Sequence, residues 1–353
     1  MDMDVGEKYC SKLRIRFGTA TFCVALLISS YFIAFPRNLH MSFLSSNLRL
    51  LIFGMNADKD ERFKHENDLE YVLNKAAMPD NTVIITTLNA AWAENNTMID
   101  IFLESLQHGQ ETQTLLKHVV IACVDEKAYA RCLIIHPHCI RVKTKGVDFS
   151  GEQALLSQDY IKMIWRRIQF LTRVLELNYN FIFTDADILW FRDPFPILRH
   201  DSRADMQIAC DHFNGRPWDV KNSPNAGFAF VRANKKTLKF YRYWYEERRI
   251  SAKMADQEVF NVIKHEDTFR NIGMNLRFLD THHIGGFCSI KYTDMTKAYT
   301  LHANCCKGLN AKLHDLREIL DLWKRWQKHH TDEEGIDPHF TETRSCQKSM
   351  HRN

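Results

Sequence analysis

The amino-acid sequence predicts an α/β protein with one main domain built on a largely parallel sheet. A chain of 353 residues is long enough to bury a large core. Its 45% apolar and 25% charged residues are typical of a globular protein, and apolar β-branched runs alternate with runs of helical periodicity. The basic residues are scattered and the net charge is only +4, so we expect no nucleic-acid partner.

An apolar segment near the N-terminus predicts a membrane anchor. Phe17–Phe35 carries no charge over nineteen residues, enough to cross a hydrocarbon layer of roughly 30 Å. More basic residues precede it than follow it, which predicts a cytoplasmic N-terminus. We therefore expect a cytoplasmic tail (1–16), a transmembrane signal-anchor (17–35), a stem (36–79), a globular domain (80–328) and a loose polar tail (329–353). A cleaved signal peptide is the alternative, but Ile33-Ala34-Phe35 is a poor cleavage site.

The first half of the globular domain shows the strand–helix alternation of parallel βαβ units. The β-branched run 82–88 predicts the first strand, and shorter apolar runs predict strands at 118–124 and 140–143. Helical patterns cover 68–77, 97–107, the sequence up to Cys132, and 159–177. The last of these is the strongest, because its apolar residues recur at helical spacing: Ile161, Ile164, Trp165, Ile168, Leu171 and Leu175.

The second half continues the same pattern around one central strand. The uninterrupted aromatic and β-branched run from Phe181 predicts a strand that is buried on both faces. Further strands are predicted at 206–210, 228–231, 276–279 and 300–302, and further helices at 235–248, 256–264 and 310–327. The pair Gly285-Gly286 predicts a turn.

The central strand ends in two carboxylates, Asp185 and Asp187, between apolar flanks. Ligands of open α/β sheets bind beyond the carboxyl ends of the strands. Two unneutralised carboxylates in apolar surroundings are costly to desolvate, so a cation is expected there. A hard divalent ion that also grips a diphosphate fits this pattern. The alternative is a turn closed by aspartate side chains.

The predicted anchor indicates on which side of the membrane each of the ten cysteines lies. Cys10 and Cys23 fall on the tail and in the anchor, which leaves eight on the far side of the membrane, where disulfides persist. Cys132 and Cys139 bracket a short segment and form a plausible local bridge, whereas the partners of the others stay open. No C-x-x-C spacing favours zinc. Asn95-Asn96-Thr97 is a glycosylation sequon.

Several separated motifs occur in a recognisable order. They are Leu88–Ala93, Thr184–Pro194 (T-D-A-D-x-x-W-F-R-D-P), Asn225–Phe228, Asp256–Asn261 and His302–Leu309, which begins H-A-N-C-C. Together they resemble the plant nucleotide-diphospho-sugar transferases, glycosyltransferase family 77. The resemblance covers roughly residues 81–326.

The resemblance implies a GT-A fold, in which a Rossmann-like nucleotide-binding half is fused to a mixed-sheet acceptor half. It also implies retention of anomeric configuration and residence in the Golgi membrane as a single-pass type II protein. The donor would be a UDP-sugar such as UDP-xylose, UDP-arabinose or UDP-galactose, with Mn²⁺ or Mg²⁺ as cofactor. The acceptor would be a cell-wall polysaccharide or a glycoprotein.

The same resemblance suggests roles for individual residues. It implies a metal site at Asp185, Asp187 and His302, in which Asp185 holds either the ion or the ribose. The alternative for His302 is an ordinary buried, hydrogen-bonded histidine, which is the more common role of a lone histidine. Asp256 and Gln257 would orient the donor sugar as catalytic residues, and Asp256 also suits the first turn of a helix. The remaining substrate-binding candidates are Asn89, Asp125, Arg166, Arg167, Asn225, Gly227 and Lys307. The alternative to a binding role for the two arginines is a solvated helix face or a structural ion pair.

Two rival functions follow from the same residues. The first is a catalytically inactive, membrane-tethered protein that binds a nucleotide sugar or a glycan. The intact carboxylates and His302 argue against it. The second is a metal-dependent phosphohydrolase, but the sequence lacks the further His/Asp cluster that a two-metal site needs.

Overall fold

The computed structural model describes residues 69–351, except 143, 145–146, 148, 153–156, 252 and 330–336. The predicted cytoplasmic tail, signal-anchor and most of the stem lie outside the described residues. Within the part that is described, no helix combines the length and the apolar character needed to cross a bilayer.

The described residues form strands and helices in alternation. The strands are β1 (Thr82–Leu88), β2 (Val119–Cys123), β3 (Cys139–Arg141), β4 (Asn180–Thr184), β5 (Ile188–Trp190), β6 (Met206–His212), β7 (Ser223–Val231), β8 (Leu276–Phe278), β9 (Ile284–Gly286) and β10 (Thr300–His302). The α-helices are α4 (Leu69–Ala76), α5 (Ala90–Ala93), α6 (Met98–His108), α7 (Glu126–Ile135), α8 (Gln158–Glu176), α9 (Phe195–Arg199), α10 (Lys235–Glu246), α11 (Asp256–Ile263), α12 (Asp267–Ile272), α13 (Leu309–His329) and α14 (Arg344–Met350). Short 3₁₀ helices are η1 (Gln113–His118), η2 (Glu247–Ile250) and η3 (Phe287–Tyr292).

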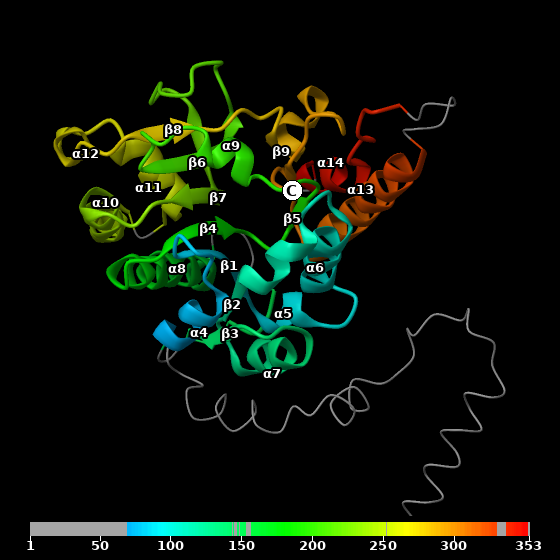
Figure 1. Ribbon diagram of the computed structural model, residues 1–353, viewed down its shortest axis with the longest axis horizontal. Coiled ribbons are helices and arrows are strands. Elements are labelled where there is room, and N and C mark those ends of the chain that lie inside the picture. Colours follow the sequence, from blue (N-terminus) through cyan, green and yellow to red (C-terminus); the bar gives the residue numbers. More distant parts are fainter. Residues whose placement is uncertain are drawn as a thin grey trace, which may run out of the picture. The chain divides into compact units, whose positions relative to one another are not determined.

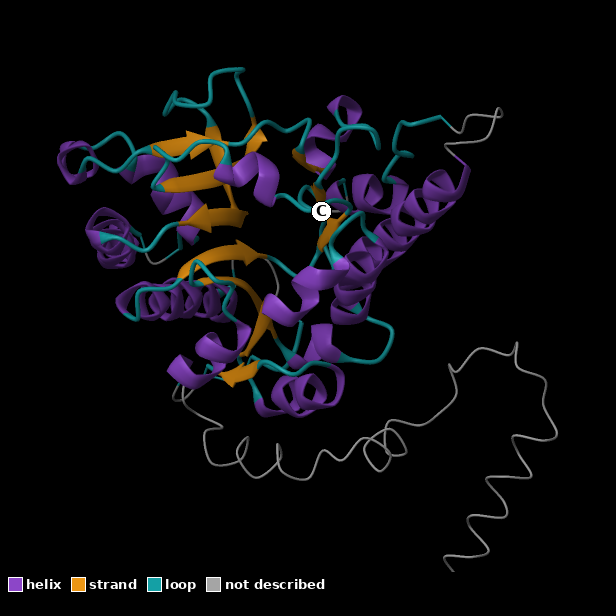
Figure 2. Ribbon diagram, in the orientation of Figure 1, coloured by secondary structure: helices purple, strands orange, loops and turns teal. Residues whose placement is uncertain are grey.

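The main sheet of the described chain has seven strands in the order β3-β2-β1-β4-β7-β6-β8. The four strands from β3 to β4 are parallel, and β7 runs antiparallel to both of its neighbours, β4 and β6. Figure 1 and Figure 2 show this sheet between two layers of helices. The expectation of an α/β fold with a parallel sheet and a mixed region is therefore confirmed.

Alternating side chains of the central strands build two cores. In β1, Val83 and Ile85 pack into one core with α4, α8, α10 and α11, whereas Ile84 and Leu88 pack into the other with α6, α7 and α9. Successive side chains of a strand point to opposite faces of the sheet. A strand covered on both faces needs apolar or β-branched side chains on both, and β1 provides them with Val83, Ile84, Ile85 and Leu88 among three threonines.

A second, three-stranded sheet has the order β5-β10-β9. It packs with α13 and part of α6 in a third core, to the right of the main sheet in Figure 1. The prediction of a turn at Gly285-Gly286 is wrong, because both glycines lie in β9 and pair with β10. An ideal Cβ on Gly286 would meet Asn304 Oδ1 at 2.4 Å, so this glycine permits close approach within the sheet.

Three disulfides crosslink the described residues. The predicted bridge between Cys132 and Cys139 is present, and the others are Cys288–Cys305 and Cys306–Cys346. The free thiols of Cys123 and Cys210 are buried.

The C-terminal segment was predicted to be loose, but residues 344–350 form α14. Its first turn is held by Asp315 of α13, whose carboxylate accepts the Ser345 and Cys346 N–H groups (3.2 and 2.8 Å). The bridge from Cys346 to Cys306 also holds it. These long-range contacts order a segment whose polar composition alone predicts a loop.

Candidate active site

The two central carboxylates lie where the chain passes from the main sheet to the small one. Asp185 follows β4, and Asp187 directly precedes β5. Strand β5 pairs with β10 so that Ile188 lies opposite His302. The Asp187 carbonyl accepts the Ala303 N–H (3.0 Å). This pairing brings His302 to the carboxylates despite its distance along the sequence.

Asp185, Asp187 and His302 form a compact cluster, in which the ligand atoms all lie within 4.8 Å of one another. His302 Nε2 lies 3.2 Å from Asp187 Oδ1 and 3.9 Å from Asp185 Oδ2. Asp187 is buried and the other two side chains are partly buried. The three residues proposed as metal ligands from the sequence are thus brought together.

The donor set of this cluster suits a hard divalent cation. Asp187 Oδ1 is buried and accepts no hydrogen bond of good geometry from the described residues, although His302 Nε2 lies 3.2 Å away. His302 Nδ1 lies 3.2 Å from Asn225 Oδ1, which also accepts the Gly227 N–H. In its neutral form His302 therefore carries the proton on Nδ1 and turns the Nε2 lone pair toward the carboxylates. Two carboxylates and an imidazole fit Mn²⁺ well and Mg²⁺ passably.

A lysine that the sequence analysis did not identify also contacts the cluster. Lys312, in the first turn of α13, places Nζ 2.5 Å from Asp187 Oδ2 and 5.7 Å from the ring centroid of Trp92. Lys307, which was predicted to reach a diphosphate, is exposed, and its backbone N–H donates to Ser349 Oγ. The sequence around Lys312 does not distinguish it from a surface lysine.

Arg167 of α8 links Asp185 to α11. It donates from Nη1 to Asp185 Oδ1 (2.9 Å) and from Nη2 to Asp256 Oδ2 (2.5 Å). The side chains of Arg167 and Asp256 are 11% and 3% exposed, so removing Arg167 takes from the buried Asp256 carboxylate its ion-pair partner. The other arginine candidate, Arg166, is not part of this cluster and instead donates to Gln169.

Asp211 joins several of the predicted sugar-site residues. Its Oδ1 accepts hydrogen bonds from Asn225 Nδ2 and Asn304 Nδ2 (2.8 Å each), and its Oδ2 accepts one from Gln257 Nε2 (2.7 Å). Gln257 Oε1 in turn accepts the Ala226 N–H (3.0 Å). The sequence analysis assigned no role to Asp211, although it follows an apolar run as the two central carboxylates do. The β6–β7 register shifts beside it, a feature that redirects side chains.

Gly227 allows these groups to approach one another. An ideal Cβ there would lie 2.5 Å from His302 Cε1, 2.7 Å from Asp185 Oδ2 and 2.9 Å from Asn225 Oδ1. All three distances are shorter than side chains tolerate. Glycine is therefore required for packing at this position, whereas the sequence predicts Gly227 as a substrate-binding residue.

Asn89 and Asp125 lie at the carboxyl ends of β1 and β2, as predicted. Asn89 caps α5 and also donates to two carbonyls of the segment after β3. Asp125 caps α7 through the Ala128 N–H (2.9 Å) and accepts the Ala90 N–H (2.7 Å). These bonds fix the strand ends, and the substrate-binding roles of Asn89 and Asp125 stay predictions.

Burial and neighbouring charges set the protonation of the cluster. Burial raises the pKa of Asp187, but Lys312 and His302 outweigh it and hold this pKa well below its usual range. Burial also raises the pKa of Asp185, which Arg167 offsets only in part and Asp187 raises further. Burial lowers the pKa of His302, yet Asp187 and Asp185 raise it by more. The Asp187 carboxylate therefore stays ionised, and its negative charge favours a bound cation beside it.

A mixed α/β sheet with carboxylates and an imidazole gathered at its strand ends has the arrangement of an enzyme active site, and this cluster could hold a metal ion. Sequence comparison identifies the family. The profile of the nucleotide-diphospho-sugar transferases matches residues 114–316, more than half of the chain. The chain belongs to this family, and it is therefore a member of a glycosyltransferase family.

Individual relatives and solved structures resemble the chain to different degrees. An uncharacterized protein of Arabidopsis thaliana is 44% identical over 80% of this chain and 76% of its own length. An Arabidopsis thaliana UDP-D-xylose:L-fucose alpha-1,3-D-xylosyltransferase is 28% identical over 54% of this chain and 56% of its own length. Among solved structures, the galactosyltransferase LgtC with donor and acceptor sugar analogs covers 69% of this chain and 95% of its own, at 11% identity and a TM-score of 0.40.

Proposed function

We propose that the chain is a metal-dependent, retaining glycosyltransferase of GT-A fold that uses a UDP-sugar. One observation carries this proposal: Asp185, Asp187 and His302 converge within 4.8 Å in a chain of the nucleotide-diphospho-sugar transferase family. A buried carboxylate oxygen without a hydrogen bond supports the metal.

Asp185, Asp187 and His302 would hold Mn²⁺ or Mg²⁺. When bound, the ion would neutralise the negative charge that develops on the departing diphosphate. The Lys312 ammonium beside Asp187 adds a second positive charge on the side of α13. Preorganised charges of this kind contribute most of the catalysis in many enzymes.

The remaining site residues position the donor sugar. Arg167 fixes Asp256 at the start of α11, and Asp211 fixes Gln257 beside it. A carboxylate and an amide at these positions would orient the sugar and stabilise positive charge at its anomeric carbon. The acceptor hydroxyl would form the new bond to that carbon as the bond to the diphosphate breaks, with its proton passing to the departing diphosphate. Because donor and acceptor then share one face, the configuration is retained.

The donor class follows from the relatives' names. UDP-xylose is the donor named for one relative, and beta-arabinofuranosyltransferase and UDP-galactose transferase activities are named for others. We infer a pentose or hexose donor, and as acceptor a cell-wall polysaccharide or a glycoprotein.

A donor screen tests this function. The purified chain is incubated with UDP-xylose, UDP-arabinose or UDP-galactose in Mn²⁺ or in EDTA, and UDP release is measured with and without candidate glycans. We expect release from one donor that depends on the metal and is lost in Asp187→Asn. Tight donor binding without release would instead support a non-catalytic sugar-binding protein, and inorganic phosphate as the product would support a phosphohydrolase.

The proposed site of action is the lumen of the Golgi, with the chain anchored as a single-pass type II membrane protein. The uncharged segment Phe17–Phe35 and the basic residues before it support this orientation. Disulfides among the described residues suit an oxidising compartment. The sequon asparagine, Asn95, is exposed. A mobility shift on endoglycosidase treatment, absent in Asn95→Gln, tests luminal exposure, and an unglycosylated, cytosolic chain would contradict it.

A further inference from the structure

A pocket of about 440 Å³ lies on α8, away from the candidate active site. It opens between α8, α10, the start of α4 and the edge strand β3. Arg166 lines it, whereas the next residue, Arg167, contacts the active-site carboxylates. Successive residues of a helix project about 100° apart, so α8 separates the two sites. The volume falls within the roughly 300–1,000 Å³ of small-molecule sites.

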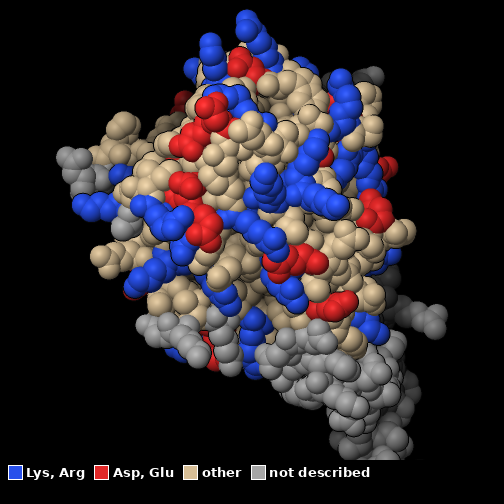
Figure 3. Space-filling view, turned by 90° about the vertical axis from the view of Figure 1, so that its left-hand side faces the viewer, with Lys and Arg blue, Asp and Glu red and all other residues tan. Residues whose placement is uncertain are grey.

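Positive charge gathers on this side of the molecule. Figure 3 views this side, and lysine and arginine side chains spread across its middle. On α8, Lys162, Arg166 and Arg173 recur at helical spacing, and on α10 Lys239 and Arg242 do the same. Of these, the three arginines line the pocket and the two lysines do not. The pocket therefore lies between two basic helix faces.

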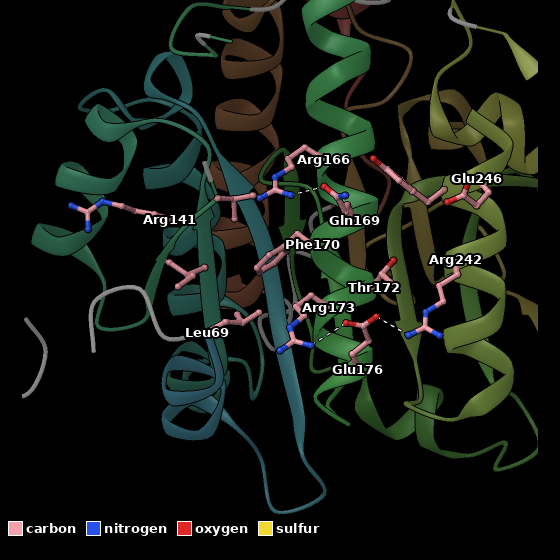
Figure 4. A pocket seen from close by; sticks show the side chains of 13 residues that line it. Leu69, Arg141, Arg166, Gln169, Phe170, Thr172, Arg173, Glu176, Arg242 and Glu246 are labelled. Atoms are coloured by element: carbon pink, nitrogen blue, oxygen red, sulfur yellow. Dashed lines mark hydrogen bonds and ion pairs between the residues drawn. The ribbon is translucent and has the colours of Figure 1, made fainter. Parts of the chain in front are cut away.

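Two of the three arginines are arranged around one carboxylate. Glu176 accepts hydrogen bonds from Arg173 (3.1 Å) and Arg242 (2.8 Å), as Figure 4 shows. The fourth arginine of the lining, Arg141, extends away from them in Figure 4 and bonds to α7. Glu176 thus holds two guanidinium groups, from two different helices, at one side of the pocket.

Arg166 retains hydrogen-bond donors that the protein does not use. Its Nη1 donates to Gln169 Oε1 (2.5 Å). Its Nε is buried, and no acceptor among the described residues reaches it. A buried donor without an acceptor is unfavourable, and an oxygen of a bound ligand would relieve this.

The charges of the pocket favour a doubly charged anion. Arg166, Arg173 and Arg242 are opposed by Glu176, which leaves two positive charges uncompensated. The other acidic residue of the lining, Glu246, pairs with arginines of its own segment. A phosphate monoester carries a charge of about −1.5 to −2 at pH 7. An arginine guanidinium group can donate two parallel hydrogen bonds to two oxygens of such a phosphate.

The rest of the lining is apolar. Leu69, Ile140, Val142 and Phe170 contribute side chains beside the arginines. We propose that this arginine pocket binds a phosphate monoester with an apolar or aromatic substituent, the phosphate on Arg166, Arg173 and Arg242 and the substituent on Leu69 and Phe170. The site is independent of the proposed transferase reaction. The phosphate belongs either to a soluble ester or to a lipid headgroup.

Binding to the full-length chain tests this proposal. Calorimetric titration in EDTA, which removes metal-dependent phosphate binding at the active site, compares phenyl phosphate, inorganic phosphate and phenol. We expect saturable binding of phenyl phosphate, weaker binding of inorganic phosphate and none of phenol. The double variant Arg166→Gln/Arg242→Gln should bind phenyl phosphate about 100-fold more weakly or worse, since each of its two lost contacts involves a charged group.

The matched control is Lys162→Gln/Lys239→Gln. It removes the same charge from the same two helices but replaces no residue of the lining, so affinity should be unchanged. Should the arginine variant fail to fold, phenylglyoxal modification of the wild-type chain replaces it. Phenyl phosphate should then protect Arg166 and Arg173, as read by mass spectrometry.

A vesicle assay separates the two sources of the phosphate. Retention on phosphatidylcholine vesicles containing phosphatidic acid, lost in the arginine variant, assigns a lipid headgroup. Binding of phenyl phosphate without such retention assigns a soluble ester. The proposal is overturned by absence of saturable phenyl phosphate binding, by equal affinity in the arginine variant, or by an equal loss in the lysine control.

Discussion

Replacing Gly227 by alanine should disable the candidate active site while leaving the protein folded. The added Cβ would lie 2.5 Å from His302 Cε1 and 2.7 Å from Asp185 Oδ2. Carbon atoms pack comfortably at about 3.5–4.0 Å, so the imidazole has to move by about 1 Å. A displacement of about 1 Å at a reacting centre lowers activity by about 100-fold. Overpacking of this kind costs about 1–3 kcal/mol of unfolding free energy.

The experiment measures kcat/KM with the donor found in the screen, Mn²⁺ affinity by calorimetry, and the melting temperature. Gly227→Ala should lose activity and metal affinity and melt several degrees lower. Gly151→Ala is the matched control, because an added Cβ there meets nothing within 4 Å. Wild-type activity and metal affinity in Gly227→Ala would refute the inferred packing of His302 against this glycine.

Three further changes test the cluster and its support. His302→Ala should raise the Mn²⁺ concentration for half-maximal activity by about tenfold or more, because a ligand is lost; an unchanged titration would remove His302 from the site. Lys312→Met should lower that concentration, because a cation leaves Asp187. Lys307→Met, a control at an exposed lysine, should leave the Mn²⁺ concentration for half-maximal activity unchanged. If Lys307→Met changed this concentration and Lys312→Met did not, Lys307 would be the lysine of the site. Cys306→Ser/Cys346→Ser opens a crosslink that spans 40 residues and should lower the unfolding free energy by about 4 kcal/mol in urea denaturation. Unaltered stability would show that other contacts suffice to hold α14.

Local sequence signals predicted the elements of the main sheet well. The run 82–88 is β-branched and bounded by polar residues, and β1 has these limits. The sequence-based predictions were wrong where contacts with residues distant in the sequence determine the local structure. Gly285-Gly286 has the composition of a turn but pairs with β10 as a strand. The segment 344–350 is polar, yet Asp315 and Cys306 hold it as a helix.

The candidate site was predictable in part for the same reason. Asp185 and Asp187 follow a buried strand, and that position alone suggested a cation site. His302 entered through the family resemblance, since the β5–β10 pairing that places it beside the carboxylates has no local signature. Asp211 and Lys312 were missed. Their roles depend on the three-dimensional proximity of β6 and α13 to the cluster.

The adjacent cysteines Cys305 and Cys306 bear on the order in which the protein matures. One is bridged back to Cys288, and the other forward to Cys346. The segment that carries His302 is therefore tied to the chain on both sides, and its second bridge can form only after residue 346 has been synthesised. A chain that ends before α14 should thus lack one of the two crosslinks beside the candidate active site.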